Sequence, residues 1–234
     1  LLEISININK VNLKKEVNAK AELNAEKRVV EALVGSSATN QTKEKFKKML
    51  RNGELDNQEI EIELLADTRS RSLSNRETDI LISLSRPKKG RLKSWKLCDY
   101  YVKLYGSSEY LKKKPQINDI KDLTKHKFVN YADELIEFPE LHYLQEINSN
   151  PNIVFSSNSL RSQLLAVKNG IGIGLLHSFV AYKEKDLKEI LPENINVKRE
   201  YWMVVHDDLF QLKRIKAVTD FLTKVLMNEK EFLI

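Results

Sequence analysis

The sequence predicts an α/β fold with a largely parallel sheet, because strand-like and helix-like segments alternate along most of the chain. Residues 59–64, EIEIEL, alternate charged and apolar side chains, as a half-buried strand does. Residues 79–84, DILISL, are an almost unbroken apolar run of the kind buried in parallel sheets. Near the end of the chain, one helical stripe carries Leu212, Ile215, Val218, Leu222 and Val225.

The remaining elements follow from the same periodicities. Further strands are predicted at residues 95–106, 127–131, 152–157, 171–176 and 199–205. Helices are predicted at residues 107–113, 117–125, 138–147, 159–170 and 209–226, with a short helix or turn at 69–77. No internal repeat interrupts this alternation.

The first quarter of the chain has a different character. Residues 14–50 are rich in Ala, Glu, Lys and Leu, and the helical pattern stops at Gly35-Ser36-Ser37. A second helix is predicted at 42–55, with Thr42 as a possible N-cap and Gly53 near its end. We therefore predict a charged helical segment at 1–58, followed by the α/β domain at 59–234. On the pattern alone, the segment is an exposed helical insertion without chemistry of its own.

Composition limits the class of protein. At 234 residues and 41% hydrophobic content, the chain can form one large domain or two lobes. No apolar run is long enough to span a membrane and no signal peptide is recognisable, so we expect a cytoplasmic protein without a membrane partner. The net charge of +6 is spread along a chain in which lysines alternate with glutamates, which favours a solvated surface. Cys98, the single cysteine, lies in a predicted strand and is expected to be structural.

No pattern points to an enzyme. Gly170, Gly172 and Gly174 form GxGxG within a predicted strand, unlike a dinucleotide fingerprint, and we expect them to let a helix pack close to the strand. The four histidines lack metal-ligand spacing, so neither a metal nor a cofactor is predicted. Asp207-Asp208 is expected to begin a helix. We name no catalytic residue, although an α/β enzyme without a recognisable nucleophile or base stays as a third class.

One segment does suggest a ligand. Ser156-Ser157-Asn158-Ser159 follows a strand and leads into an amphipathic helix, which is where α/β sheets bind ligands. A small anion would meet backbone N–H donors and the positive end of the helix dipole there. A plain N-cap without a ligand explains the same residues equally well.

From about residue 59 to 226 the chain resembles the effector-binding domain of LysR-type transcriptional regulators. The matching segments occur in the family's order: EIELLADTRSRSLSNRETDILISLSRP, GRLKSWKLCDYYVKLYGSSEYL, PQINDIKDLTKHKFVNY, SSNSLRSQLLAVKNGIGIGLLHS and LPENINVKREYWMVVHDDLFQLKRIKAVTDFL. The sequence departs at Ser108-Glu109, where a proline is common, and at His177, where a proline is frequent.

The resemblance implies a two-lobed, type II periplasmic-binding-protein-like fold that senses a small effector, a small anion or an amino acid. The first lobe would comprise about 59–98 and 198–234, the second about 99–197, and the crossing strands would be Asp99 to Tyr105 and Glu200 to Val205. A homodimer is possible. Carried over by position, the effector-binding residues would be Ser85, Tyr131, Ser157, Asn158, Ser159, His177 and Phe179. For His177, an ordinary surface or core histidine is the simpler interpretation.

The chain departs from the family at its beginning. It has no room for the family's winged helix-turn-helix, so we expect no direct nucleic-acid binding. The opening LLEISININKVNLKK at most resembles the end of the linker helix, and the first strand and first helix of the first lobe are expected to be absent. The first lobe is thus predicted to be incomplete, with a row of unpaired backbone groups.

Residues 19–64 resemble instead part of the intermediate domain of the ATP-dependent unfoldase of the HslUV (ClpYQ) protease. AELNAEKRVVEALVG and FKKMLRNGELDNQEIEIEL carry this resemblance, and that family's nucleotide-binding motifs are missing, so no ATPase activity is expected. EIEIEL fits both families, which suggests a junction between two coding sequences. The alternative function is therefore a module that binds protein substrates or partners.

Overall fold

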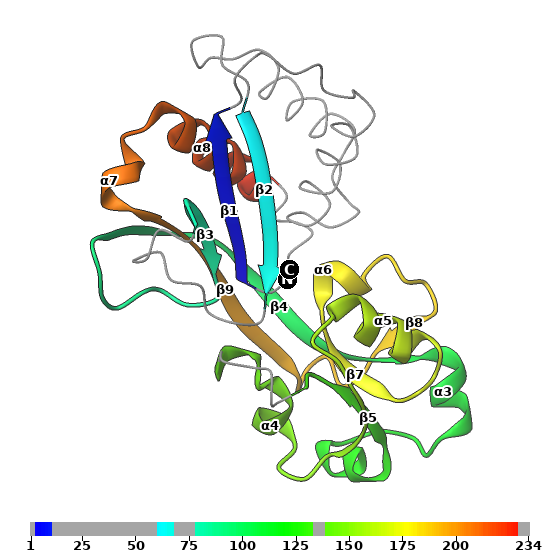
Figure 1. The fold of residues 1–234 in the computed structure, drawn as a ribbon. Helices are drawn as coiled ribbons and strands as arrows, with labels where there is room; N and C mark the ends of the chain where they lie inside the picture. Colours follow the sequence, from blue (N-terminus) through cyan, green and yellow to red (C-terminus); the bar gives the residue numbers. More distant parts are fainter. Residues whose placement is uncertain (1–2, 11–59, 68–77, 133–138, 229–234) are drawn as a thin grey trace, which may run out of the picture. The chain divides into compact units, whose positions relative to one another are not determined.

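The computed structural model describes residues 3–10, 60–67, 78–132 and 139–228 (Figure 1). These fall into two compact units. The first consists of Leu1–Asp67, Arg71–Cys98 and Tyr201–Lys230, and the second of Thr68–Ser70, Asp99–Glu200 and Glu231–Ile234. The helical hairpin predicted within 14–55 and the short element at 69–77 lie outside the described residues. The boundary at residue 58 therefore stays a prediction.

The first unit holds strands in the order β2-β1-β3-β9. Their bounds are β1 Glu3–Lys10, β2 Ile60–Asp67, β3 Ile80–Ser83 and β9 Asn196–His206, of which the part from Tyr201 lies in this unit. All three pairings are antiparallel, with Ile6 opposite both Leu64 and Ile80, and Ile82 opposite Met203. The strands predicted at 59–64, 79–84 and 199–205 are thus confirmed as β2, β3 and β9.

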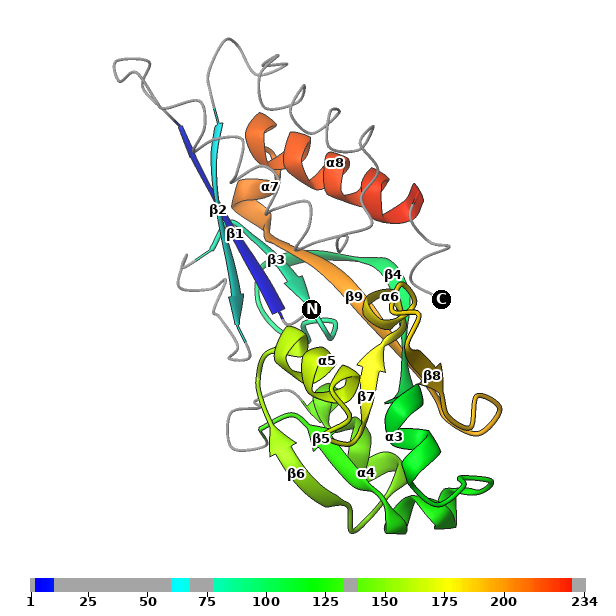
Figure 2. The ribbon, with the colours of Figure 1, turned by 90° about the vertical axis from the view of Figure 1, so that its right-hand side faces the viewer.

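The core of this unit lies between the strands and the last helix. Side chains of Ile6, Ile80, Ile82, Met203 and Val205 are almost fully buried and share one face by register. Helix α8, Lys213–Asn228, runs alongside these strands (Figure 2) and buries Ile215, Val218 and Leu222. The short helix α7, Asp207–Phe210, begins at the aspartate pair as predicted, and the single helix predicted at 209–226 is divided after it.

The opening residues correct two predictions. Residues 3–10 are a strand rather than the end of a linker helix, because Ile4, Ile6 and Ile8 alternate with polar residues. The strand expected to be missing is therefore replaced by β1, whose eight residues all pair with β2. Thr78 anchors β1 further, since its hydroxyl and the Asp79 N–H both donate to the Ile6 carbonyl, at 3.2 and 3.1 Å. The predicted absence of the first helix of this lobe stays a prediction, because residues 11–59 lie outside the described residues.

The second unit holds its own strands in the order β4-β7-β5-β6, with β8 also on β4. Their bounds are β4 Leu92–Ser107, which enters this unit at Asp99, β5 Lys127–Asn130, β6 Asn152–Ser156, β7 Ile173–His177 and β8 Leu187–Glu189. Strands β5 and β6 are parallel, as are β5 and β7, whereas β4 is antiparallel to both β7 and β8. The strands predicted in this region are confirmed.

The prediction of a largely parallel sheet is wrong. Parallel pairing joins β6, β5 and β7, whereas the pairings β1–β2, β1–β3, β3–β9, β4–β7 and β4–β8 are antiparallel. The apolar run 79–84 has a different cause, because β3 is buried along all four residues while its neighbours β1 and β9 run the other way. Burial on both faces gives the same sequence pattern as parallel pairing.

Short helices connect the strands of the second unit. They are α3 Ser108–Lys113, η3 Ile120–Lys125, η5 Pro139–Leu141, α4 Tyr143–Ile147, α5 Leu160–Lys168 and α6 Ser178–Ala181. The segments predicted as helices at 117–125 and 138–147 are wholly or partly 3-10 helix, whereas those at 107–113 and 159–170 are α-helical. Cys98 is buried in β4, as expected for a structural cysteine.

The glycine cluster lets α5, β7 and β5 approach closely, as predicted. A Cβ on Gly174 would lie 2.8 Å from Cγ2 of Val167 in α5, and one on Gly172 would lie 2.5 Å from the Lys127 carbonyl oxygen. Gly170, with φ +71°, ends α5 in a Schellman motif: its N–H donates to Val167, and that of Ile171 donates to Ala166. Each glycine therefore meets a separate steric requirement.

We expect alanine substitutions to destabilise the chain in the order Gly172, Gly174, Gly106. The Lys127 carbonyl belongs to the strand backbone and cannot move aside, Val167 is a stiff β-branched side chain, and Cβ of Gly106 would meet only the ends of Ile173, Ile190 and Leu111. Overpacking costs typically about 1–3 kcal/mol, and G172A should exceed this range. Urea unfolding of the three variants measures the order, and equal losses would contradict it.

Candidate functional site

Three strand ends of the second unit meet at one edge. Because β6, β5 and β7 are parallel neighbours, their carboxyl ends point the same way. Tyr131 directly follows β5, Ser157 follows β6, and His177 is the last residue of β7. The register pairs Asn130 with Ser156, and the Ser157 N–H donates to the Asn130 carbonyl at 3.1 Å. The fold thus brings together predicted site residues from three separate segments.

The residues before α5 form a well-satisfied N-cap. The Ser159 hydroxyl accepts from the Ser162 N–H at 3.3 Å, and the Ser157 hydroxyl accepts from the Ser159 N–H at 3.1 Å. The buried Gln163 amide donates to the Ser157 carbonyl at 2.7 Å, while Asn158 is exposed. No acidic residue lies in the first turn, so the positive end of the helix dipole is not neutralised there.

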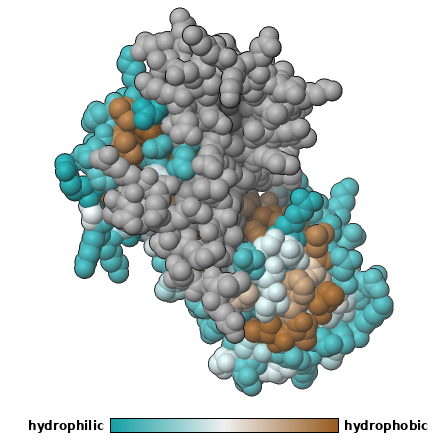
Figure 3. All heavy atoms as spheres, viewed as in Figure 1, coloured by the Kyte–Doolittle hydropathy of each residue, from teal (hydrophilic) through white to brown (hydrophobic). Residues whose placement is uncertain are grey.

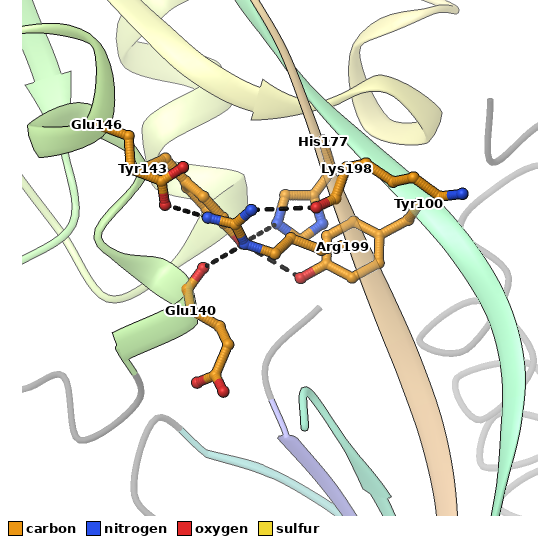
Figure 4. Close-up of polar contacts among 7 residues, drawn as sticks. All are labelled: Tyr100, Glu140, Tyr143, Glu146, His177, Lys198 and Arg199. Carbon is orange, nitrogen blue, oxygen red and sulfur yellow. Dashed lines mark hydrogen bonds and ion pairs between the residues drawn. The ribbon is translucent and has the colours of Figure 1, made fainter. Parts of the chain in front are cut away.

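His177 lies in a buried aromatic cluster (Figure 4). Its ring stacks on Tyr100 with centroids 4.9 Å apart, and Phe179 meets it edge-on at 5.2 Å. The Tyr143 hydroxyl lies 3.5 Å from His177 Nε2 and 3.3 Å from the Tyr100 hydroxyl. Burial lowers the pKa of His177 well below the ordinary range, so the imidazole is neutral at physiological pH and can both donate and accept.

Tyr131 adjoins this cluster with an unpaired hydroxyl. Its ring lies 6.2 Å from that of Tyr143, and only 2% of the residue is exposed. The buried Tyr131 Oη has no hydrogen-bond partner within the part of the chain that the structure describes. Burial raises the pKa of Tyr131, which keeps the hydroxyl protonated. A buried hydroxyl without a partner is uncommon and marks a position where a ligand could supply one.

Arg199 of β9 also lies against Tyr143 (Figure 4). Its Nε donates to the Glu140 carbonyl at 3.2 Å, and a terminal nitrogen forms an ion pair with the Glu146 carboxylate. The guanidinium carbon lies 5.4 Å from the centre of the Tyr143 ring. The positive charge of Arg199 is thus matched by Glu146 and does not stand free for an anion.

Three residues of this cluster were missed from the sequence: Tyr100, Tyr143 and Arg199. Tyr100 shares an alternating face with Val102 and Leu104 in β4, so its burial was predictable. Nothing in the sequence marks Tyr143 or Arg199, because their neighbours come from elements far away along the chain.

The last predicted site residue, Ser85, belongs to the first unit. It follows β3, is half-buried, and its N–H lies 3.4 Å from the Ser83 hydroxyl. The contacts just described join Tyr131 to His177 through Tyr143 and join Phe179 to His177 directly. Separate hydrogen bonds join Ser157 to Ser159. Ser85 shares none of them.

Residues 41–227 match the family described as the LysR substrate binding domain. The chain belongs to this family. The resemblance found in the sequence is therefore confirmed, and so is the two-lobed, type II periplasmic-binding-protein-like α/β class. The family also gives the general function of the chain, which is that of a LysR-type regulatory domain.

Solved structures share the fold. The regulatory domain of CrgA from Neisseria meningitidis matches with a TM-score of 0.54 and 24% identity, over 67% of this chain and 81% of that one. The regulatory domain of AphB from Vibrio vulnificus matches with a TM-score of 0.52 and 17% identity, over 67% of this chain and 81% of that one. The CcmR regulatory domain from Synechocystis PCC6803, in complex with 2-PG, matches with a TM-score of 0.54 and 16% identity, over 67% of this chain and 77% of that one.

Curated relatives match a different part of the chain. The ATP-dependent protease ATPase subunit HslU of Rhodospirillum centenum is 55% identical over 64 residues, which is 27% of this chain and 15% of that protein. The same subunit of Bartonella tribocorum is 47% identical over 74 residues, 32% of this chain and 17% of that protein. The match is N-terminal and supports the resemblance of that segment to the unfoldase.

No group of three or more His, Cys, Asp and Glu side chains among the described residues could hold a metal ion. No helix within the described ranges is long and apolar enough to cross a membrane.

Acid should destabilise this chain through its buried histidines. Burial lowers the pKa of His177 and of His126, so the unfolded chain binds protons at a higher pH than the folded chain. The free energy of unfolding is therefore unaffected by these histidines above the unfolded-state pKa of about 6.5. As pH falls below that value, it decreases by up to about 1.4 kcal/mol per pH unit for each histidine.

Urea unfolding between pH 7.5 and 5 measures this slope. We expect the variant H177Q to lower the slope and H126Q/H177Q to lower it further. The half-buried His142, in the same unit, provides the matched control H142Q. A slope that H177Q leaves unchanged would contradict the assignment.

Proposed function

We propose that this domain binds a small-molecule effector, a small anion or an amino acid, at the joined ends of β6, β5 and β7. One observation carries the proposal: the buried hydroxyl of Tyr131 has no partner within the described residues and lies beside the cluster of Tyr143 and His177. Leaving a buried hydroxyl unpaired costs about 1–3 kcal/mol, which a ligand atom would recover.

The surroundings favour recognition by neutral hydrogen-bonding groups and a helix dipole. Tyr131 and His177 offer a hydroxyl and a neutral imidazole, and the N-terminus of α5 offers a positive dipole end with no acidic residue beside it. Arg199 is already paired with Glu146. A ligand with modest negative charge and an aromatic or hydroxylated body suits this set better than a multivalent anion. The CcmR regulatory domain, which was solved in complex with 2-PG, supports the binding of a small molecule by this fold.

Binding would act by a shift of population, without catalysis. An effector that prefers one conformation of the domain raises the fraction of molecules in that conformation by its difference in affinity. Ser157, Asn158 and Ser159 would orient the ligand, and Phe179 would cover it.

The N-terminal similarity supports a second candidate function. Identity of 55% over 64 residues to an HslU subunit is far above the identity to any of the regulatory domains described above. The alternative is thus a module that binds protein substrates or partners through that segment, without ATPase activity. Ligand-induced stabilisation of the second unit distinguishes the two functions, because the alternative does not require it.

The variant Y131F should have opposite effects on stability and on binding. Removing the unpaired hydroxyl should raise the unfolding free energy of the unliganded chain, by about 1 kcal/mol, and should weaken the effector. Thermal unfolding with a panel of small carboxylates and amino acids first identifies the effector. A ligand at 100 times its dissociation constant stabilises the native state by about 2.7 kcal/mol.

Tyr182, exposed in the same unit, provides the matched control Y182F, which should retain the full ligand-induced shift. The proposal fails if no compound in the panel raises the midpoint of the wild-type chain. It fails equally if Y131F responds to the effector as strongly as Y182F does.

A further inference from the structure

The connection between β3 and β4 is strongly basic. Residues 80–98 contain six Lys and Arg side chains and no Asp or Glu, although the whole chain has 33 acidic residues against 39 basic ones. All six cations fall within residues 86–96, here called the basic segment. The segment lies within the first unit, so its surface is defined by that unit alone.

The structure holds the backbone of this segment while leaving its charges outside. Gly90 has φ +105°, which gives the tight turn before β4, and the Arg91 carbonyl accepts from the Asp207 N–H at 2.9 Å. Arg86, Lys88, Lys89 and Arg91 are all exposed. In Figure 3, hydrophilic residues cover most of the described surface where Figure 1 shows α7 and the β3–β4 connection.

Only part of this charge is neutralised. Arg91 and Lys93 lie 3.5 and 3.6 Å from Asp208 and Asp207, in pairs whose side chains are 41–76% exposed. Exposed pairs of this kind contribute little and exchange readily for another anion. Arg86, Lys88 and Lys89 have no carboxylate partner among the described residues.

The nearby aromatic rings are already occupied by cations. The Arg86 guanidinium lies 5.4 Å from the centre of the Trp202 ring, and Lys93 Nζ lies 4.3 Å from that of Phe210. Trp95 meets Phe210 edge-on and donates its indole N–H to Thr223 at 3.3 Å. Unpaired bases would need free ring faces to stack on, so single strands are disfavoured, whereas a phosphate backbone needs only the exposed cations.

We propose that the basic segment is a docking surface for the phosphate backbone of duplex DNA, independent of base sequence. Arg86, Lys88, Lys89 and Arg91 would each approach a phosphate and release its counterions. The sequence alone predicts no direct nucleic-acid binding, because no helix-turn-helix is recognisable in it. A backbone contact of this kind requires no such motif.

Salt dependence tests the proposal on the full chain. With four phosphate contacts, log K should fall with log salt at a slope of about −3.6, so raising salt from 50 to 200 mM should weaken binding about 150-fold. The variant K88Q/K89Q should reduce the slope to about −1.8 and that loss to about 12-fold. Fluorescence anisotropy of a labelled 20-base-pair duplex measures both.

Two controls make the result specific. K88R/K89R keeps the charge and should bind as the wild type does, and K112Q/K121Q removes two exposed lysines of the second unit and should leave the slope unchanged. The proposal is overturned if no binding occurs at 50 mM salt with 100 μM chain, or if K112Q/K121Q lowers the slope as much as K88Q/K89Q. It is also overturned if single-stranded DNA or polyglutamate binds more tightly than the duplex.

Discussion

The parallel pairing of β5 with both β6 and β7 decides which residues of the second unit can meet. Parallel neighbours place their carboxyl ends at one edge, and this brings Tyr131, Ser157 and His177 together from segments that are far apart in sequence. The pairing depends in turn on Gly172 and Gly174, because a side chain at either position would collide with β5 or with α5. Local steric requirements thus determine where the candidate site can form.

Charge at this edge is arranged so that little of it is free. Arg199 is matched by Glu146, and burial keeps His177 neutral and Tyr131 protonated. A buried charge would need a partner of its own, whereas burying a neutral donor or acceptor in the absence of a ligand costs less free energy. The cost that does remain is the Tyr131 hydroxyl, and we infer that the effector offsets it.

Sequence patterns were sufficient for elements whose periodicity is local. The strands at 127–131, 152–157 and 171–176 and the helix at 159–170 were predicted with nearly the bounds that the structure shows. The direction of pairing was not predictable, since β3 is as apolar as a parallel strand while lying between antiparallel neighbours. The alternation of Ile4, Ile6 and Ile8 was a local signal for β1 that the prediction missed, whereas its pairing with β2 and β3, 50 or more residues away, was not predictable. The contact of Arg199 with Tyr143 was hidden for the same reason as that pairing.

The central claim is that a ligand binds at the joined ends of β6, β5 and β7. Hydrogen exchange of the full chain, with and without the compound that stabilises it most, tests this directly because it locates the protected amides. The account predicts slower exchange in residues 157–162, 130–132 and 175–179. Protection confined to α8, or an exchange pattern that the compound leaves unchanged at all three strand ends, would contradict it.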